Sequence, residues 1–200
     1  MLRLSFLFLL SLLMNTGFSQ YNWKLEKQKD GINAYLSDIA GSNYKAVRVE
    51  CTMTGTYAKL ITLVTNVADF NKWIYNTKRT KLIERKSAFD FIYYTETYMP
   101  WPLSNRDLAI HVRIKTDSLP RFLIINGADE KTIVPEILGK VRVPHYKANW
   151  KVTMLSANTI HISYILEVNP GGNISAWMAN SFADKGPFET FSNLVELLKK

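Results

Sequence analysis

A two-residue alternation of apolar and polar side chains recurs in the longest unbroken segments of this 200-residue sequence. In Tyr44–Thr54, every second residue from Val47 to Met53 is apolar, and Leu108–Thr116 and Thr159–Val168 repeat the pattern. Such alternation is typical of antiparallel strands with one face toward a core and the other toward water. A sheet of this kind must cover its apolar face with a second layer.

Two parts of the chain change to a helical period. A helix is predicted over Tyr57–Val67, followed by a shorter helical turn over Asp69–Tyr75. The last segment, Ser175–Lys199, predicts a longer amphipathic helix with a kink at Gly186-Pro187, where Pro187 begins the second half. Its apolar stripe consists of Phe188, Phe191, Leu194, Val195 and Leu198. This terminal helix is the only predicted element long enough to cover the sheet.

The other segments complete an α+β domain. The predicted strands are Ile32–Leu36, Tyr44–Thr54, Leu82–Ser87, Phe91–Met99, Leu108–Thr116, Arg121–Ala128, Val141–Leu155 and Thr159–Val168. Trp23–Lys29 is expected to form a short polar helix or turn. We therefore expect these strands to form an antiparallel sheet curved around one helix. A strongly curved sheet of this kind leaves an interior space that side chains or a ligand must fill.

The first 19 residues have the three parts of a secretory signal. Arg3 supplies a positive charge, Leu4–Met14 is an uncharged run, and Asn15–Ser19 is a polar end with small residues at positions 17 and 19. The run is too short to cross a bilayer as a helix, although an uncleaved anchor is the alternative. We expect cleavage after Ser19, a single domain over residues 20–200, and a secreted or periplasmic location.

Four segments together resemble one protein family. Pro100-Trp101-Pro102-Leu103-Ser104-Asn105-Arg106-Asp107 is similar to the aromatic-Pro-x-Ser-Asn-Arg-Asp motif of START (steroidogenic acute regulatory-related lipid-transfer) domains. Lys29–Tyr35, Asp69–Trp73 and Asn169–Asn180 resemble further family segments in the same order. The resemblance covers about Trp23–Lys200, nearly all of the chain that follows the predicted signal.

This resemblance implies a helix-grip fold, in which a curved antiparallel β-sheet wraps around a long C-terminal α-helix and encloses an apolar cavity. The cavity would hold one lipid or other hydrophobic small molecule, for transfer or for sensing. The loop Met99–Asp107 and the helix Ile174–Phe191 would form its gate.

A lipid-sized pocket needs an apolar and aromatic lining with few polar groups. The candidate ligand-binding residues are Trp101, Arg106, Trp150, Tyr164, Trp177, Met178 and Phe182. For each apolar candidate, packing in the core is the alternative, because large aromatic side chains fill interiors in any case.

Arg106 has two interpretations. Its guanidinium could hold an oxygen of a ligand headgroup, or it could pair with Asp107 or satisfy loop carbonyls. Many family members carry a second basic residue six positions later, where this chain has Val112 and places Arg113 on the opposite face. Asn71 stands where some phospholipid carriers place an arginine. These departures favour a neutral or weakly polar ligand over a phosphate headgroup.

The composition excludes several other classes. One cysteine excludes a disulfide framework and a cysteine-based zinc site, and the three histidines lack metal-binding spacing. The chain contains no nucleophile-elbow, zinc-protease or phosphate-loop motif, so we expect no catalytic residue, metal or cofactor. We also expect a monomer.

The formal net charge of +8 reflects two basic groups, within residues 72–86 and 140–151. They could support transient contact with an anionic membrane surface, or could form a solvated face. Nucleic-acid binding is not expected of an exported chain.

The function predicted from these observations is binding of a lipid without chemical turnover. The alternative is a helix-grip enzyme, a cyclase or hydrolase, that acts on an apolar substrate. It would need an acid or base in the cavity, and Glu96, Glu167, Tyr94 and His161 are the candidates. Alternation places none of them with the main apolar stripes. A third possibility is an interaction module whose cavity is collapsed and filled by its own aromatic residues.

Overall fold

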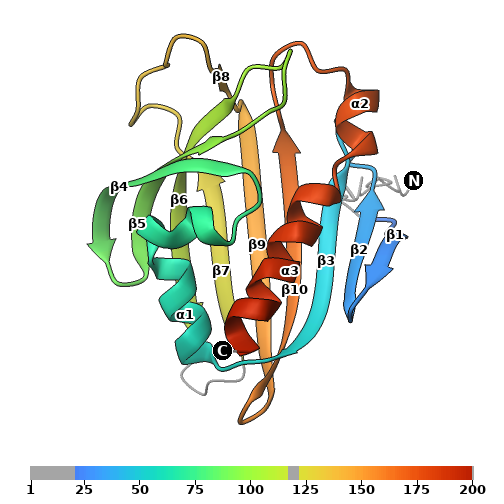
Figure 1. The fold of residues 1–200 in the computed structure, drawn as a ribbon, viewed down its shortest axis with the longest axis vertical. Coiled ribbons are helices and arrows are strands. Elements are labelled where there is room, and N and C mark those ends of the chain that lie inside the picture. The colour runs from blue at the N-terminus through green and yellow to red at the C-terminus, as the bar shows by residue number, and fades with distance from the viewer. Residues whose placement is uncertain (1–20, 117–121, 200) are drawn as a thin grey trace, which may run out of the picture.

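The computed structural model describes residues 21–116 and 122–199, so the predicted signal at residues 1–19 lies outside the described part. One antiparallel sheet has the strand order β1-β2-β3-β10-β9-β7-β6-β5-β4, and β8 pairs in parallel with the start of β6 (Figure 1). The strands are β1 (Lys24–Lys29), β2 (Ile32–Ser37), β3 (Ala46–Thr54), β4 (Thr77–Ser87), β5 (Asp90–Thr97), β6 (Arg106–Thr116), β7 (Phe122–Asp129), β8 (Val141–Arg142), β9 (His145–Ser156) and β10 (Thr159–Asn169). The α+β helix-grip prediction is confirmed.

Four helical segments accompany the sheet in the described ranges: α1 (Tyr57–Thr65), the 3₁₀ helix η1 (Val67–Lys72), α2 (Ala176–Ser181) and α3 (Lys185–Lys199). The sheet curves around α3, which contacts β2 and β3, while α1 and η1 lie over the same face nearer the opposite edge, where η1 contacts β4 (Figure 1). Helix α1 begins where the Thr56 side chain accepts a hydrogen bond from the Lys59 amide, the usual role of a threonine before a helix. None of these helices is both long and apolar enough to span a bilayer.

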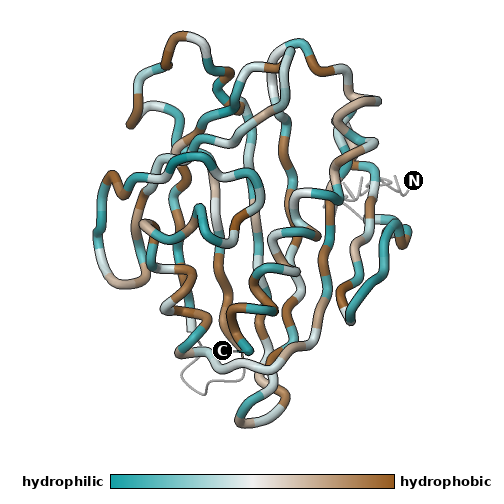
Figure 2. Tube along the Cα trace, in the orientation of Figure 1, coloured by the Kyte–Doolittle hydropathy of each residue, from teal (hydrophilic) through white to brown (hydrophobic). Residues whose placement is uncertain are grey.

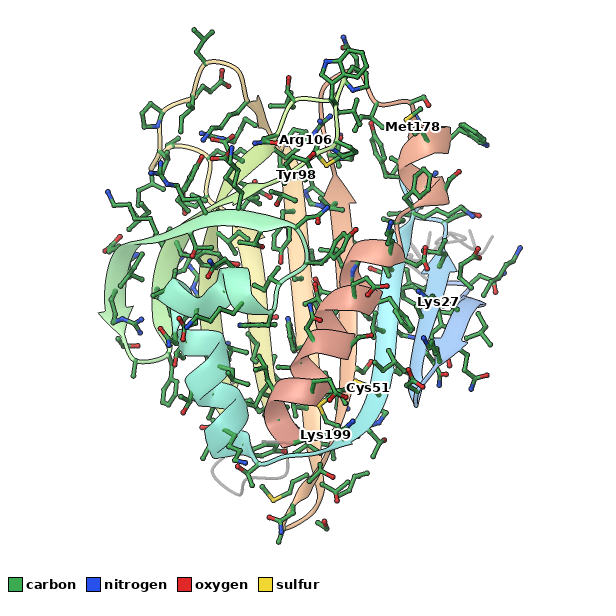
Figure 3. The ribbon with its side chains drawn as sticks, in the orientation of Figure 1. Lys27, Cys51, Tyr98, Arg106, Met178 and Lys199 are labelled. Atoms are coloured by element: carbon green, nitrogen blue, oxygen red, sulfur yellow. The ribbon has the colours of Figure 1, made fainter. Side chains whose placement is uncertain are left out.

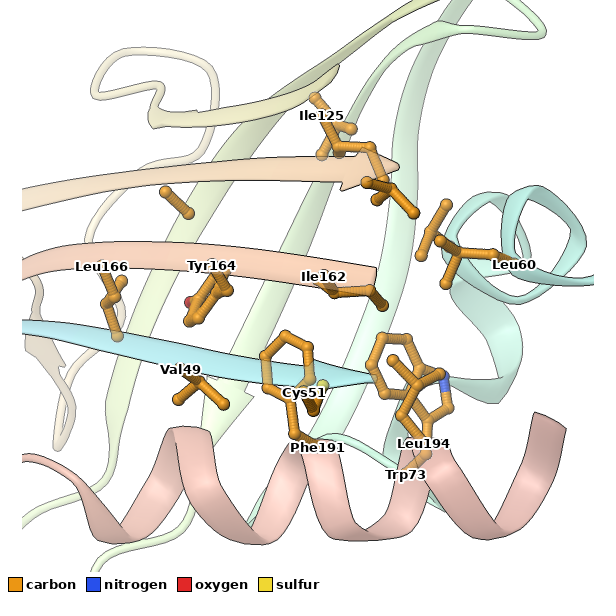
Figure 4. Packing of buried hydrophobic residues seen from close by; sticks show 14 of the residues in the cluster. Val49, Cys51, Leu60, Trp73, Ile125, Ile162, Tyr164, Leu166, Phe191 and Leu194 are labelled. Atoms are coloured by element: carbon orange, nitrogen blue, oxygen red, sulfur yellow. The ribbon is translucent and has the colours of Figure 1, made fainter. Parts of the chain in front are cut away.

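The apolar stripe of α3 supplies the second layer that the alternating strands require. Phe188, Phe191, Leu194 and Leu198 are each 3% exposed or less. Figure 4 shows Phe191 and Leu194 pointing at Val49, Cys51 and Ile162 of the sheet, and Figure 2 shows apolar residues recurring along the strands that face α3. Full burial of one such side chain stabilises a fold by about 1.5–3 kcal/mol.

The prediction for Trp23–Lys29 was wrong, because this segment contains the edge strand β1. It pairs with β2 through a tight hairpin in which Asp30 and Gly31 have φ values of 52° and 77°. An Asp-Gly pair with positive φ at both positions is the favoured two-residue hairpin turn. The polar composition of the segment follows from its exposed edge position, not from a helical turn.

The terminal helix is interrupted earlier than predicted. Helix α2 ends at Ser181 and α3 begins at Lys185, so Gly186 and Pro187 fall in the first turn of α3 instead of in a kink. Proline is tolerated there because the first N–H groups of a helix have no partner within the helix.

Candidate functional site

A cavity of about 320 Å³ lies between the sheet and the helices α3 and η1. Its lining comes from β5, β6, β7, β9 and β10 on the sheet side and from α1, η1 and α3 on the helix side. The interior is therefore hollow, and the third possibility, a collapsed core, does not describe this structure. The volume falls at the lower end of the range of small-molecule pockets, about 300–1,000 Å³.

Aromatic rings form two of the cavity walls. Trp150, Tyr164 and Phe191 contact one another, with ring centroids 4.9–5.2 Å apart. On the opposite side, Phe70 packs edge-on against Tyr93 at 5.0 Å. The ring pairs are edge-on or tilted, both of which are favourable aromatic contacts, so these walls are apolar surfaces built from aromatic rings.

The polar side chains of the lining are almost all hydroxyls. They belong to Tyr75, Thr77, Tyr93, Thr95, Thr97, Tyr146, Tyr164 and Thr190. Arg106 is the one charged side chain among the described lining residues, and Val112 lines the cavity where the family often has a base. Arg113 points to the other face, as alternation predicts, with its side chain 56% exposed.

Arg106 is 5% exposed and ties two loops together. Its guanidinium donates to the carbonyls of Ser104, Pro170 and Gly171 at 2.5, 3.3 and 3.2 Å, and burial lowers the pKa of the group. The predicted capping of loop carbonyls is therefore confirmed. The alternative pairing with Asp107 does not form, because that carboxylate accepts from Arg142 instead. A role in binding a headgroup stays a prediction.

The structure brings three of the seven candidate ligand-binding residues into the cavity lining: Arg106, Trp150 and Tyr164. The other four lie outside the lining, where Trp101, Trp177, Met178 and Phe182 are 91, 76, 42 and 64% exposed. These four stand on the loop before β6 and on or just after α2. Helix α2 buries none of its residues, because the break at residues 182–184 separates it from α3 (Figure 1).

The sequence analysis missed three prominent lining residues: Tyr93, Tyr146 and Phe191. Alternation could have identified both tyrosines, since Tyr93 is two positions from buried Phe91 and Tyr146 two positions from buried Ala148. Phe191 belongs to the predicted stripe of α3, and only its place beside Trp150 makes it part of the wall.

The acid and base candidates of the enzyme alternative lie away from the cavity lining. Glu96 is buried on the outer face of β5, where it accepts from Lys140 at 2.5 Å and from Asn105 at 2.7 Å. Burial alone would raise the pKa of Glu96, but hydrogen bonds from Lys140, Asn105 and Lys78 outweigh it and lower the pKa to about 2. Tyr94 accepts from the same Lys140 amine.

The remaining two candidates are also engaged elsewhere. Glu167 accepts from the Tyr21 hydroxyl at 2.8 Å, and His161 pairs with Thr52 at 3.0 Å. In the described ranges, no three His, Cys, Asp or Glu side chains gather closely enough to hold a metal ion.

These features define a helix-grip ligand-binding protein. Its curved antiparallel sheet wraps around the terminal helix, and an apolar cavity lies between the two. The START domain family model matches residues 10–200, and the chain belongs to this family. It is 34% identical over 179 residues to the Pseudomonas aeruginosa protein PA1579, covering 90% of this chain and 88% of that one. It is 26% identical over 180 residues to the phosphatidylcholine transfer protein of Mus musculus, covering 88% and 83% of the two chains.

Solved structures show the same architecture. A STAR-related lipid transfer protein from Xanthomonas axonopodis superimposes with a TM-score of 0.82 at 25% identity, covering 89% of this chain and 99% of that one. Human StAR-related lipid transfer protein 5 superimposes with a TM-score of 0.74 at 17% identity, covering 88% and 86%.

Proposed function

We propose that the protein takes up one lipid or similar hydrophobic molecule into its cavity and exchanges it with a membrane, without altering it chemically. The main support is the cavity itself, whose walls are aromatic rings and whose polar lining is hydroxyls and one arginine. Relatives named as lipid transfer proteins agree with this class of ligand. Binding without turnover agrees with the positions of Glu96, Tyr94, Glu167 and His161 away from the lining.

Filling the cavity tests this proposal. Ala148 is 3% exposed and lines the cavity, so Ala148→Phe places a ring in the ligand space. We expect the purified wild-type protein to yield about one bound lipid per chain on solvent extraction and mass spectrometry, and the variant to yield little. The matched control is Ala128→Phe, on an exposed position of the neighbouring strand β7. Equal recovery from wild type and Ala148→Phe, or none from wild type, would contradict the proposal.

We further propose that ligand enters at the end of the cavity lined by Thr97, Met99, Arg106 and Pro170, here called the Arg106 end. The loop 98–105 and helix α2 border this end and would act as its gate. Helix α2 is held to the segment before β3 by Asn180, which accepts from the Lys45 amide and donates to the Asn43 carbonyl. The loop 98–105 is held more firmly, because the Ser104 carbonyl accepts from Arg106 and Asn105 donates to Glu96. Opening of the gate would therefore begin at α2.

The same gate would contact the membrane. Figure 3 shows Tyr98, Arg106 and Met178 near one end of the molecule, and the exposed side chains of Trp101, Trp177 and Phe182 belong to the same two segments. Tryptophan and phenylalanine are favoured at membrane–water interfaces, because their rings enter the headgroup region. Lys140 and Arg142 contribute little to such contact, since Glu96 and Asp107 pair with them. A secreted or periplasmic location and a monomeric state remain part of this proposal.

A further inference from the structure

Three tyrosine side chains meet within the cavity. Tyr93 on β5, Tyr146 on β9 and Tyr164 on β10 all belong to its lining, and Tyr93 and Tyr164 are each 7% exposed. The hydroxyls of Tyr146 and Tyr164 are close enough to influence each other, and the Tyr93 hydroxyl is close enough to interact electrostatically with both. Three strands that are far apart in sequence thus deliver three phenols to one place.

Neighbouring residues pack closely around this cluster. A Cβ atom on Gly127 would lie 3.4 Å from Cε1 of Tyr146 and 3.4 Å from a methyl of Ile110, which is ordinary contact distance. The Tyr146 ring therefore packs directly over β7. On the other side, Trp150 and Phe191 pack against the Tyr164 ring at 5.0 and 5.2 Å and fix its orientation.

All three phenols are uncharged at neutral pH. Burial raises the pKa of Tyr146 to about 12, and the neighbouring Tyr164 hydroxyl offsets part of that effect. Burial, and after it the neighbouring hydroxyls, raise the pKa values of Tyr93 and Tyr164 well above 10. Each group therefore offers one O–H donor and a lone-pair acceptor. The interactions among the three hydroxyls use only part of these donors and acceptors.

We propose that Tyr93, Tyr146 and Tyr164 form a neutral polar site inside the cavity that recognises a hydroxyl or carbonyl oxygen of an uncharged, compact hydrophobic ligand. This inference rests on the proposed function, because it concerns a ligand held in the same cavity. An oxygen placed among the three phenols would complete their hydrogen bonding. A ligand without such an oxygen would leave the buried hydroxyls unpaired. The free-energy cost of these lost hydrogen bonds would select strongly against that ligand.

The rest of the lining opposes a charged headgroup in the interior. Arg106 is the one charged side chain among the described lining residues, and three of its N–H groups already donate to loop carbonyls. No lining carboxylate in the described ranges would balance a bound cation. The volume of about 320 Å³ also suits a single-chain or ring-shaped molecule better than a two-chain lipid.

A competition among three probes with one common chain tests the site. The full protein is incubated with equal amounts of hexadecane, 1-hexadecanol and hexadecylphosphocholine, and the bound fraction of each is measured by mass spectrometry. We expect 1-hexadecanol to exceed hexadecane by about tenfold or more, and to exceed hexadecylphosphocholine as well. In the triple variant Tyr93→Phe, Tyr146→Phe, Tyr164→Phe, the preference for the alcohol should fall to near unity.

The variant's binding of hexadecane shows whether it is folded, and Tyr35→Phe, on β2 and outside the cavity lining, is the matched control. A second measurement needs only the wild-type protein. The carbonyl stretch of bound 2-hexadecanone should appear at lower frequency than in hexane, as it does when a hydroxyl donates to it.

The inference is overturned if alcohol and alkane bind equally, if the triple variant keeps the preference, or if the carbonyl stretch matches that in hexane. Tightest binding of hexadecylphosphocholine would overturn it in favour of a charged headgroup. Absence of binding by all probes would contradict the proposed function itself, and the inference would fall with it.

Discussion

On the outer face of the sheet, Glu96 is the centre of a charged cluster that holds the segment before β8. It is 4% exposed, accepts from Lys140 and Asn105, and lies 3.3 Å from Lys78. Its pKa falls from 4.5 to about 2. Because the folded state binds the proton more weakly than the unfolded state, this carboxylate stabilises the fold above about pH 4.5, and the stabilisation disappears as the pH falls toward 2.

Replacing the carboxylate should remove that pH dependence. We expect Glu96→Gln to lower the free energy of unfolding at pH 7 by about 2–3 kcal/mol, because the half-buried Lys140, whose side chain is 17% exposed, loses its counter-ion. Urea unfolding measured between pH 7 and pH 2 should show a smaller loss of stability for the variant than for wild type. The control is Glu84→Gln at an exposed position of β4. Parallel pH profiles for wild type and Glu96→Gln would show that the cluster contributes nothing.

At the residue scale, alternation predicted which way a side chain points but not what covers it. It correctly predicted that Val112 and Arg113 lie on opposite faces of the sheet and that Glu96 does not lie on the apolar face. It could not predict that Glu96 is buried, because its partner Lys140 is 44 residues away in an irregular segment. Contacts of that kind leave no periodic signal in a sequence.

At the scale of elements, α2 is weakly anchored to the rest of the described chain. It has six residues, none of them buried, and the break at residues 182–184 separates it from the packed helix α3. Its link to the sheet is Asn180, which bonds the backbone of Asn43 and Lys45 at 2.9 Å each. A segment held this weakly can open without unfolding the core.

Cutting that link should speed up ligand exchange. We expect Asn180→Ala to raise the rate of release of a bound fluorescent fatty alcohol to acceptor vesicles several-fold, while the free energy of unfolding changes by about 1 kcal/mol or less. Stopped-flow fluorescence measures the rate. Ser181→Ala is the matched control, because the Ser181 hydroxyl bonds only to Trp177 within the same helix in the described contacts. If both variants release ligand at the wild-type rate, α2 is not part of the gate.

Elements with long periodic patterns were predicted well, and short ones were not. The central strands and the stripe of α3 followed directly from periods of two and of three to four residues. The prediction failed for the edge strand β1 because its exposed side chains show no alternation, although the Asp30-Gly31 pair is typical of a hairpin turn. The helix break was misplaced because Gly-Pro is compatible with both a kink and a first turn.

At the scale of the whole molecule, four ordered motifs predicted the fold, and the sequence could not show which aromatic residues face the cavity. Trp150 and Trp177 are the same type of residue, yet Trp150 lines the cavity and Trp177 is 76% exposed. The difference depends on the direction in which α2 leaves the sheet, and that is set by packing over the whole domain. The exposed aromatic residues of loop 98–105 and α2 have a physical consequence of their own, since several large apolar side chains exposed on two short segments mark an interaction surface, whereas a single one would not.

These residues predict a membrane-facing end of the molecule. Replacing Trp101 and Trp177 together by alanine should weaken binding to phosphatidylglycerol-containing vesicles by about tenfold or more, because burial of one large apolar side chain contributes about 1.5–3 kcal/mol. Vesicle co-sedimentation measures the change. Leu155→Ala is the matched control, since Leu155 is 59% exposed on the β9–β10 hairpin at the opposite end of the sheet (Figure 1). If moderate salt abolishes binding while the tryptophan variant binds like wild type, basic residues alone govern the contact. If the tryptophan variant and Leu155→Ala both lose binding, the membrane contact is not specific to either end of the molecule.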